Sequence, residues 1–185
     1  MKRISVFCGS SMGASAEYEK EARALGKLLA EKGIGVVYGG ASVGLMGAVA
    51  DGAMEAGGEV IGIMPKLLAK REVTHNNLTD LHIVNTMHER KAMMAHLSDG
   101  FISLPGGAGT MEEFFEVFTW AMIGEHKKPC GLLNINDYYT PLLTFFDHMV
   151  EEKFLKEESR KIVIVESDAA VMLEKFIKIE NEQAL

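Results

Sequence analysis

Residues 101–123 read FISLPGGAGTMEEFFEVFTWAMI, and this stretch decides the fold. The apolar run from Phe101 to Leu104 predicts a short buried strand, which the glycine-rich turn from Pro105 to Thr110 ends. Residues 111–123 then predict a long helix with a heavily apolar face. A strand, a tight turn and a helix in succession form the repeating unit of α/β proteins.

The same alternation continues in both directions along the chain. Further strands are expected at 4–8, 34–38, 60–64, 81–84, 131–135 and 162–165, and further helices between Ser15 and Gly33 and at 44–56, 87–97, 139–150 and 169–179. Residues 66–80 have no clear period and are expected to form an irregular loop with a helical turn, and residues 180–185 are expected to fray. Because the strands are wholly apolar, we expect an α/β fold: a Rossmann-like, doubly wound parallel sheet of about seven strands with helices on both faces. Residues 1–185 are expected to form a single domain.

The composition fits a globular domain and excludes several classes of protein. Apolar residues make up 48% and charged residues 24% of the 185-residue chain, which excludes disordered and fibrous chains. The 26 acidic and 19 basic residues give a net charge of −7, which disfavours binding to a nucleic-acid polymer. The two cysteines, Cys8 and Cys130, cannot form a disulfide framework, and we find no signal peptide or membrane span. These features predict a soluble cytoplasmic protein.

Three of the turns that follow expected strands are rich in glycine and hydroxyl groups: residues 9–13, 39–44 and 105–110. Glycine lets backbone N–H groups approach a ligand closely, and a helix N-terminus favours an anion there. One such turn could be a tight turn and nothing more, but three at one edge of a parallel sheet favour a phosphate site. Besides the third turn, the candidate binding residues are Gly9, Ser10, Gly39, Gly40 and Ser42.

The spacing of these glycines excludes two common nucleotide sites. The first turn is not G-x-G-x-x-G, and the second strand ends in Gly39-Gly40, where a dinucleotide site carries a carboxylate for the ribose. The chain also lacks the G-x-x-x-x-G-K-[ST] pattern of a triphosphate cradle. A mononucleotide or a sugar phosphate remains.

Glu113 and Arg90 each allow a structural and a functional interpretation. Thr110 and Glu113 have the spacing of a capping box with Thr110 as N-cap, which by itself would explain Glu113. A carboxylate beside a phosphate site repels the ligand, which is understandable if the carboxylate acts on the sugar. Arg90 either belongs to a solvated charged face with Glu89 or reaches a phosphate or carboxylate, and the sequence favours neither. The six histidines lack metal-ligand spacing, so no metal site is predicted.

Residues 105–113 match the P-G-G-x-G-T-x-x-E signature of the LOG (LONELY GUY) family. Members of this family are cytokinin riboside 5′-monophosphate phosphoribohydrolases that were long mislabelled as possible lysine decarboxylases. Residues 87–91, MHERK, resemble the second signature of the family, and Gly39-Gly40 with GLMG at 44–47 resembles a third. Ala41 departs from this pattern, because many relatives have a third glycine there. The resemblance extends from Val6 to about Leu143 and so covers most of the chain.

The resemblance implies hydrolysis of the N-glycosidic bond of an adenosine-type 5′-monophosphate, which gives free base and ribose 5-phosphate. It implies Arg90 and Glu113 as the catalytic pair, with the Glu113 carboxylate stabilising positive charge on the sugar. It also implies a homodimer, and it requires no metal or redox cofactor. The substrate-binding positions that it implies are Glu72, Lys91, Gly107, Ala108, Gly109, Thr110, Met111, Glu112 and Thr119.

Two other functions compete with this one. Molybdenum-cofactor carrier proteins are similar in fold and in their glycine turns, and such a carrier would bind a nucleotide without consuming it. The Arg90–Glu113 pair argues against a carrier, since a phosphate binder gains nothing from that carboxylate. A decarboxylase that uses pyridoxal phosphate needs a Schiff-base lysine with an acidic partner for the ring nitrogen, and no lysine of this sequence has such a setting.

Overall fold

A computed structural model describes residues 1–69 and 74–183 of the chain. Its strands are β1 Arg3–Phe7, β2 Gly35–Tyr38, β3 Val60–Pro65, β4 Asp80–Val84, β5 Gly100–Ser103, β6 Cys130–Leu133 and β7 Val163–Glu166. They form one seven-stranded sheet in the order β4-β3-β2-β1-β5-β6-β7, and each neighbouring pair is parallel. The predicted Rossmann-like parallel sheet is thereby confirmed.

The strand order contains one reversal, and this reversal creates a crevice at one edge of the sheet. The chain moves outward from β1 through β2 and β3 to β4, and then returns to place β5 on the other side of β1. In open α/β sheets, ligands bind outside the carboxyl ends of the strands at such a switch point. The turns after β1 and β5 are therefore neighbours at the crevice.

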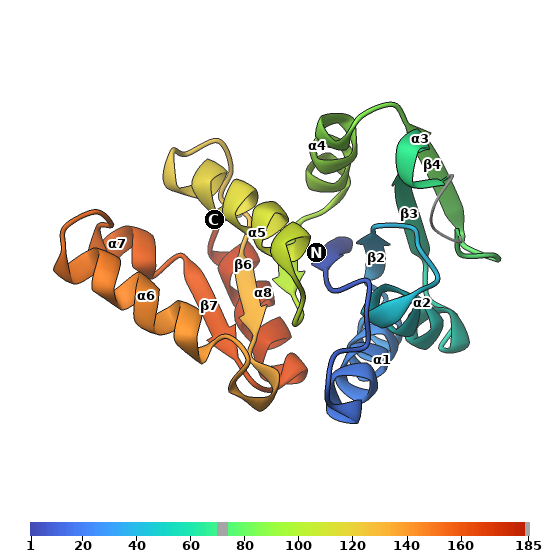
Figure 1. Ribbon diagram of the computed structural model, residues 1–185, viewed down its shortest axis with the longest axis horizontal. Helices are drawn as coiled ribbons and strands as arrows, with labels where there is room; N and C mark the ends of the chain where they lie inside the picture. Colours follow the sequence, from blue (N-terminus) through green and yellow to red (C-terminus); the bar gives the residue numbers. More distant parts are fainter. Residues whose placement is uncertain (70–73, 184–185) are drawn as a thin grey trace.

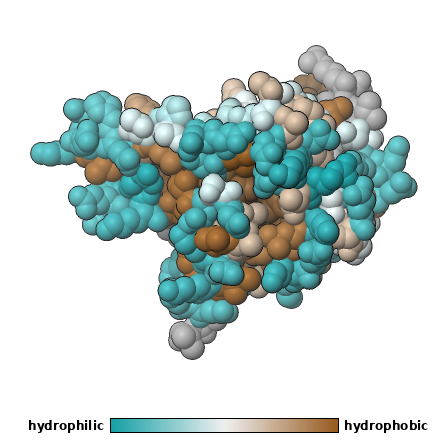
Figure 2. Space-filling view, turned by 90° about the horizontal axis from the view of Figure 1, so that it is seen from below, coloured by the Kyte–Doolittle hydropathy of each residue, from teal (hydrophilic) through white to brown (hydrophobic). Residues whose placement is uncertain are grey.

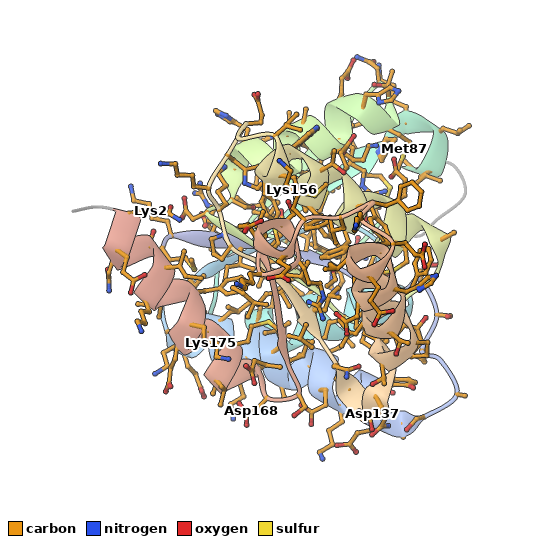
Figure 3. The ribbon with its side chains drawn as sticks, turned by 90° about the vertical axis from the view of Figure 1, so that its left-hand side faces the viewer. Lys2, Met87, Asp137, Lys156, Asp168 and Lys175 are labelled. Carbon is orange, nitrogen blue, oxygen red and sulfur yellow. The ribbon has the colours of Figure 1, made fainter. Side chains whose placement is uncertain are left out.

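Helices cover both faces of the sheet (Figure 1). The helices are α1 Ala16–Glu31, α2 Gly44–Glu55, α3 Lys66–Ala69, α4 Met87–Leu97, α5 Ala108–Met122, α6 Thr140–Glu151, α7 Glu157–Arg160 and α8 Ala169–Gln183, with a 3₁₀ turn, η1, at Ile135–Asp137. Leu25 of α1, Val49 of α2 and Phe176 of α8 belong to one apolar core. Met94 of α4 and Phe114 of α5 belong to the other. Figure 3 shows Met87 at the start of α4 and Asp168, just before α8, at opposite sides of the molecule.

The first helix begins and ends where the sequence predicts. The Ser15 hydroxyl accepts a hydrogen bond from the backbone N–H of Glu17 at 3.3 Å, which caps α1. Gly33 follows the helix with φ of +69°, a conformation that costs glycine little because it has no Cβ. Local chemistry therefore sets both ends of α1.

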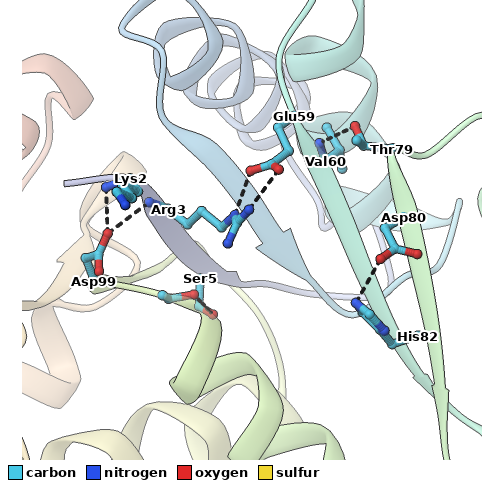
Figure 4. Close-up of polar contacts among 10 residues, drawn as sticks. Lys2, Arg3, Ser5, Glu59, Val60, Thr79, Asp80, His82 and Asp99 are labelled. Atoms are coloured by element: carbon cyan, nitrogen blue, oxygen red, sulfur yellow. Dashed lines mark hydrogen bonds and ion pairs between the residues drawn. The ribbon is translucent and has the colours of Figure 1, made fainter.

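Polar contacts tie the edge of the sheet where the strands begin (Figure 4). The Arg3 guanidinium donates to both carboxylate oxygens of Glu59, at 2.6 and 2.9 Å. The Asp99 carboxylate accepts from the backbone N–H groups of Lys2 and Arg3, at 2.6 and 3.1 Å. These contacts fix the chain around β1 at the edge opposite the crevice.

The last helix extends further than the sequence predicts. Residues 180–183, where fraying is expected, continue α8 to Gln183. Glu180 pairs with the N-terminal amino group of Met1, and the Gln183 amide donates to the Lys127 carbonyl at 2.7 Å. These tertiary contacts, which local sequence does not reveal, hold the end of the helix.

On the face that Figure 2 shows, hydrophilic side chains surround several apolar patches. Among the described residues, no helix is both long enough and apolar enough to cross a bilayer. Cys8 and Cys130 are both buried free thiols.

Candidate active site

A cavity of about 330 Å³ lies at the crevice between the ends of β1 and β5. The turns after these two strands form its floor, and α4 and α5 supply its charged side chains. Its lining consists of Cys8, Gly9, Ser10, Met46, Leu68, Met87, Arg90, Gly107, Ala108, Gly109, Thr110, Glu112 and Glu113. The structure thus brings together the predicted catalytic pair and most of the predicted phosphate turn.

The N-terminus of α5 opens into this cavity. The helix begins at Ala108 with Gly107 as its N-cap, and no side chain in the described part of the chain caps it. The backbone N–H groups of the first turn therefore remain available to an anion. The predicted capping box is wrong, because Thr110 lies inside the first turn instead of at the N-cap. The backbone of Gly107 takes the extended N-cap conformation three residues earlier.

The glycines of this turn fall into two groups. Gly106 is required by packing, since a Cβ there would lie 2.1 Å from the Thr110 hydroxyl oxygen. Gly107 and Gly109 differ: a Cβ would meet nothing within 4 Å, and neither has a positive φ. Each of the other 17 glycines has either a positive φ or a neighbour within 4 Å of that Cβ. The fold therefore does not need glycine at 107 or 109, whereas close approach of a ligand does.

Arg90 of α4 and Glu113 of α5 form an ion pair in the wall of the cavity. Arg90 Nη2 lies 3.6 Å from Glu113 Oε1, and the two side chains are 9% and 10% exposed. The Arg90 Nε is buried and has no hydrogen-bond partner in the described structure. A buried donor without a partner is unusual in a folded protein and makes the Arg90 guanidinium a candidate for ligand contact.

Gly39, directly after β2, leaves the space in which the Arg90 guanidinium lies. A Cβ on Gly39 would lie 2.2 Å from Arg90 Nη2 and 2.8 Å from the Met46 sulfur. Gly39 is predicted to bind substrate, but it does not line the cavity. It leaves room for the side chain that does.

Burial dominates the electrostatics of the site. It raises the pKa of Glu113 above its ordinary value of 4.5, and the Arg90 guanidinium opposes this by attraction. Burial also raises the pKa of the Cys8 thiol, and the nearby Glu113 carboxylate raises it further. Cys8 is therefore a neutral thiol at the cavity wall. Within residues 1–69 and 74–183, no three His, Cys, Asp or Glu side chains form a group that could hold a metal ion.

Several predicted binding residues lie away from the cavity. Gly40, with φ of +82°, shapes the turn after β2, and its carbonyl accepts from the backbone N–H of His75 at 3.0 Å. A Cβ on Gly47 of α2 would lie 2.4 Å from the Ser42 carbonyl oxygen, so the backbone of Ser42 packs closely against α2. Met111 packs against the core instead of lining the cavity.

The resemblance also implies Thr119, Lys91 and Glu72 as binding residues. Thr119 is exposed on α5, nine residues after Thr110, or roughly 13 Å along the helix axis. Lys91 is 7% exposed and pairs with Glu112 and Glu116 instead of lining the cavity. Glu72 lies outside the described residues.

Sequence reasoning did not identify four residues of the lining. Three of them are Cys8, Met46 and Met87, and Met87 precedes Arg90 by three positions and so shares its helix face. Leu68 gave no signal, because it comes from α3 in the segment without a clear period. These residues give the cavity an apolar wall.

Comparison with known proteins identifies the family. A family model described as "Possible lysine decarboxylase" matches residues 46–176. "Cytokinin riboside 5'-monophosphate phosphoribohydrolase LOG" of Oryza sativa subsp. japonica is 49% identical, over 97% of this chain and 73% of its own length. The chain belongs to the LOG family. A LOG-family relative from Rhodococcoides fascians, named "Cytokinin riboside 5'-monophosphate phosphoribohydrolase", is also 49% identical, over 90% of this chain and 85% of its own length.

Solved structures share the fold of this LOG-family chain at lower identity. The Moco carrier protein of Chlamydomonas reinhardtii superposes with a TM-score of 0.73 at 23% identity, covering 98% of each chain. The molybdenum cofactor binding protein of Rippkaea orientalis gives a TM-score of 0.72 at 24% identity, covering 96% of each chain. At this level of identity, the likeness shows a common fold and no more.

Proposed function

We propose that this LOG-family protein hydrolyses the N-glycosidic bond of cytokinin riboside 5′-monophosphates or AMP, giving the free adenine-type base and ribose 5-phosphate. The observation that carries the proposal is the buried Arg90–Glu113 pair, which lies beside an uncapped helix N-terminus in one cavity. The names of the relatives from rice and Rhodococcoides fascians describe this same reaction.

The 5′-phosphate of the substrate binds at the first turn of α5. Backbone N–H groups from Ala108 to Thr110 donate to the phosphate oxygens, and the bare Cα atoms of Gly107 and Gly109 allow close approach. Fixing the phosphate fixes the sugar as well, and this orientation contributes to the rate.

Glu113 acts at the anomeric carbon of the sugar. Breaking the bond to the base develops positive charge on the ribose, and a buried carboxylate stabilises that charge and orients the attacking water. The Arg90 guanidinium, 3.6 Å from Glu113, favours the ionised carboxylate. Arg90 either orients this carboxylate or assists the departing base through its free donor. The base then lies toward the apolar wall formed by Met46, Leu68 and Met87.

A nucleotide or molybdenum-cofactor carrier is the alternative. The likeness to carrier proteins is one of fold, at 23% and 24% identity. A carrier gains nothing from a carboxylate that repels the phosphate and must be desolvated inside the cavity. The Glu113 side chain therefore favours the hydrolase.

We further propose that the protein forms a homodimer in the cytoplasm. Ile123, at the end of α5, is 72% exposed, and Phe154 and Phe145, near and on α6, are 88% and 54% exposed. A second copy would cover such apolar side chains. The two buried free thiols suit a reducing compartment. Light scattering of the purified protein should give twice the 20.3 kDa mass of the chain, and the mass of one chain would contradict the dimer.

The proposed reaction is tested with two substrates and two variants. Base release is followed by chromatography from AMP and from adenosine, which lacks the phosphate. We expect release from AMP, and at least about a hundredfold less from adenosine because the α5 site is then empty. Glu113→Gln should abolish base release. Glu174 is an exposed carboxylate on α8, so Glu174→Gln should leave base release unchanged. Full activity in Glu113→Gln would contradict the assigned role.

A further inference from the structure

The backbone carbonyl groups of the turn between β5 and α5 are bound by donors from outside this turn. The Tyr139 hydroxyl donates to the Leu104 carbonyl at 2.6 Å, and the Tyr138 hydroxyl donates to the Gly106 carbonyl at 2.5 Å. The Pro105 carbonyl between them accepts from a backbone N–H of the turn after β1, at 3.1 Å. Three consecutive peptide groups are thus fixed directly before the start of α5.

The two tyrosines follow a stretch of backbone in an uncommon conformation. Asn136 and Asp137, in the 3₁₀ turn η1, have φ of +51° and +56°, which asparagine and aspartate tolerate better than most residues with a Cβ. The Asn134 side-chain oxygen accepts from the backbone N–H of Tyr139 at 2.6 Å and closes this turn. Such a backbone persists where its surroundings determine it, and here it brings both tyrosines to the turn before α5.

The two hydroxyl groups act on different kinds of peptide group. A trans peptide group is planar, so its C=O and its N–H point in opposite directions. The peptide group that Tyr139 binds precedes Pro105, and proline has no N–H. The peptide group that Tyr138 binds precedes Gly107 and carries the Gly107 N–H. Only Tyr138 can therefore orient a hydrogen-bond donor through the carbonyl that it binds.

This turn lies between two cavities. Gly107 lines both the cavity of the Arg90–Glu113 pair and a second cavity of about 230 Å³, whereas Gly106 and Tyr138 line the second cavity and not the first. The Gly106 carbonyl meets Tyr138 on the side of the second cavity. The N–H of the same peptide group points the opposite way. A hydrogen bond to the carbonyl also polarises the peptide group, which strengthens its N–H as a donor.

Burial separates the two tyrosines further. Tyr139 is 1% exposed, whereas Tyr138 is 42% exposed. A buried carbonyl that loses its donor is left unsatisfied, but a carbonyl near the surface can bind water instead. The Tyr139 hydroxyl therefore contributes mainly to stability, and the hydrogen bond of Tyr138 has a different purpose.

The geometry points to Tyr138 as a positioning residue of the phosphate site: its hydroxyl binds the Gly106 carbonyl and thereby aims the Gly107 N–H at the substrate phosphate. This N–H adds a donor directly before those of the first turn of α5. The role rests on the proposed function, because it serves the same phosphate. Tyr138 itself acts from the second cavity and does not touch the substrate.

Tyr138→Phe and Tyr139→Phe test this as a matched pair, because each removes one hydroxyl from the same turn. Calorimetry with ribose 5-phosphate, which the reaction does not consume, measures the affinity of the phosphate site. The Kd should rise at least about threefold in Tyr138→Phe and less than about 1.5-fold in Tyr139→Phe. An unchanged Kd in Tyr138→Phe, or equal losses of affinity in both variants, would overturn the proposal.

Thermal melting of the same variants should give the reverse order. The melting temperature should fall by at least about 2 °C in Tyr139→Phe, because a buried acceptor loses its donor, and by less in Tyr138→Phe. A larger fall in Tyr138→Phe would mean that its hydroxyl only stabilises the turn, and it would overturn the positioning role.

Nitrogen-15 NMR of protein labelled at glycine observes the aimed donor itself, with Gly107→Ala identifying the resonance. In the wild type, ribose 5-phosphate should move the Gly107 amide proton to lower field, as a new hydrogen bond to an anion does. In Tyr138→Phe at saturating ligand, this movement should be smaller. An equal movement in both proteins would overturn the proposal.

The remaining outcomes are distinct as well. If Tyr139→Phe does not fold by circular dichroism, Tyr18→Phe replaces it, because the Tyr18 ring lies 6.0 Å from that of Tyr138 and lines the same second cavity. Its Kd should equal that of the wild type, and a loss as large as in Tyr138→Phe would overturn the proposal.

The proposed function and the role of Tyr138 can fail separately. If the wild type releases no base from AMP while Tyr138→Phe weakens ribose 5-phosphate binding as expected, the hydrolase fails and the positioning role stands. If the wild type binds no ribose 5-phosphate, the phosphate site fails and the positioning role fails with it.

Discussion

At the level of single residues, the site depends on side chains that are missing as much as on those that are present. Gly39 leaves the space in which the Arg90 guanidinium lies, and Gly107 and Gly109 leave space at the start of α5. The sequence identified these glycines as important, and the structure separates Gly39, which leaves room for Arg90, from Gly107 and Gly109, which leave the start of α5 open.

Gly39→Ala should displace Arg90, because the new Cβ would lie 2.2 Å from Arg90 Nη2. We expect kcat to fall at least about tenfold, since the guanidinium no longer stands beside Glu113. Steady-state kinetics with AMP measure this. Lys27→Ala is the control, because Lys27 is exposed on α1 and does not line the cavity. A wild-type kcat in Gly39→Ala would contradict the role of Gly39 in leaving room for Arg90.

Gly109→Ala should separate stability from function. Alanine is a better helix former than glycine, and its Cβ meets nothing within 4 Å, so the free energy of unfolding should rise by about 0.5–1 kcal/mol. The same Cβ projects toward the phosphate site, so KM for AMP should rise at least about tenfold. Urea unfolding and kinetics on the same preparation test both. An unchanged KM would contradict binding of the phosphate at this turn.

Glu113 should give the protein a characteristic pH dependence. Its pKa is raised in the folded state, so the folded protein holds this proton more tightly than the unfolded chain does. The resulting contribution to stability is fully present below the ordinary value of 4.5 and is lost as pH rises through the folded pKa. In urea unfolding at several pH values, wild type should lose this contribution and Glu113→Gln should not. Parallel profiles for the two proteins would contradict the shift.

At the level of elements, the sequence predicts a helix end correctly where a nearby capping side chain or glycine determines that end. Ser15 and Gly33 bound α1 as expected, whereas Thr110 to Glu113 misplaced the start of α5. A capping box is a strong signal for a helix start, but Gly107 takes the extended N-cap conformation three residues earlier, and no side-chain cap is formed there. The segment 66–80 lacked a period because α3 is only four residues long, so Leu68 could not be placed.

The close contact between helices α1 and α2 is another feature that the sequence alone does not reveal. A Cβ on Gly26 would lie 2.0 Å from the Val49 carbonyl oxygen, because the two helices touch there. Gly26→Ala should therefore push α1 and α2 apart and lower the free energy of unfolding by about 1–3 kcal/mol. Lys27 is exposed on the same helix, so Lys27→Ala should change the free energy of unfolding by less than about 0.5 kcal/mol. Calorimetric melting compares the two, and equal stabilities would contradict the close contact.

At the level of the whole molecule, the strand order determines the site. Alternating strands and helices predicted a parallel sheet, but periodicity does not say which strands are neighbours. The order that places β5 beside β1 brings the turns after these strands together, while the turn after β2 comes to support them. Thr119 could not be located from the signature, because distance along α5 carries it away from the cavity.

We propose that the Arg90–Glu113 cavity hydrolyses a nucleoside 5′-monophosphate instead of storing it. The most direct measurement is the product balance after the pure wild-type protein is incubated with AMP and with isopentenyladenosine 5′-monophosphate. We expect one free base and one ribose 5-phosphate for each nucleotide consumed, and the ratio of the two rates ranks the substrates. Recovery of both nucleotides intact, after binding that calorimetry detects, would contradict the hydrolase and identify a carrier.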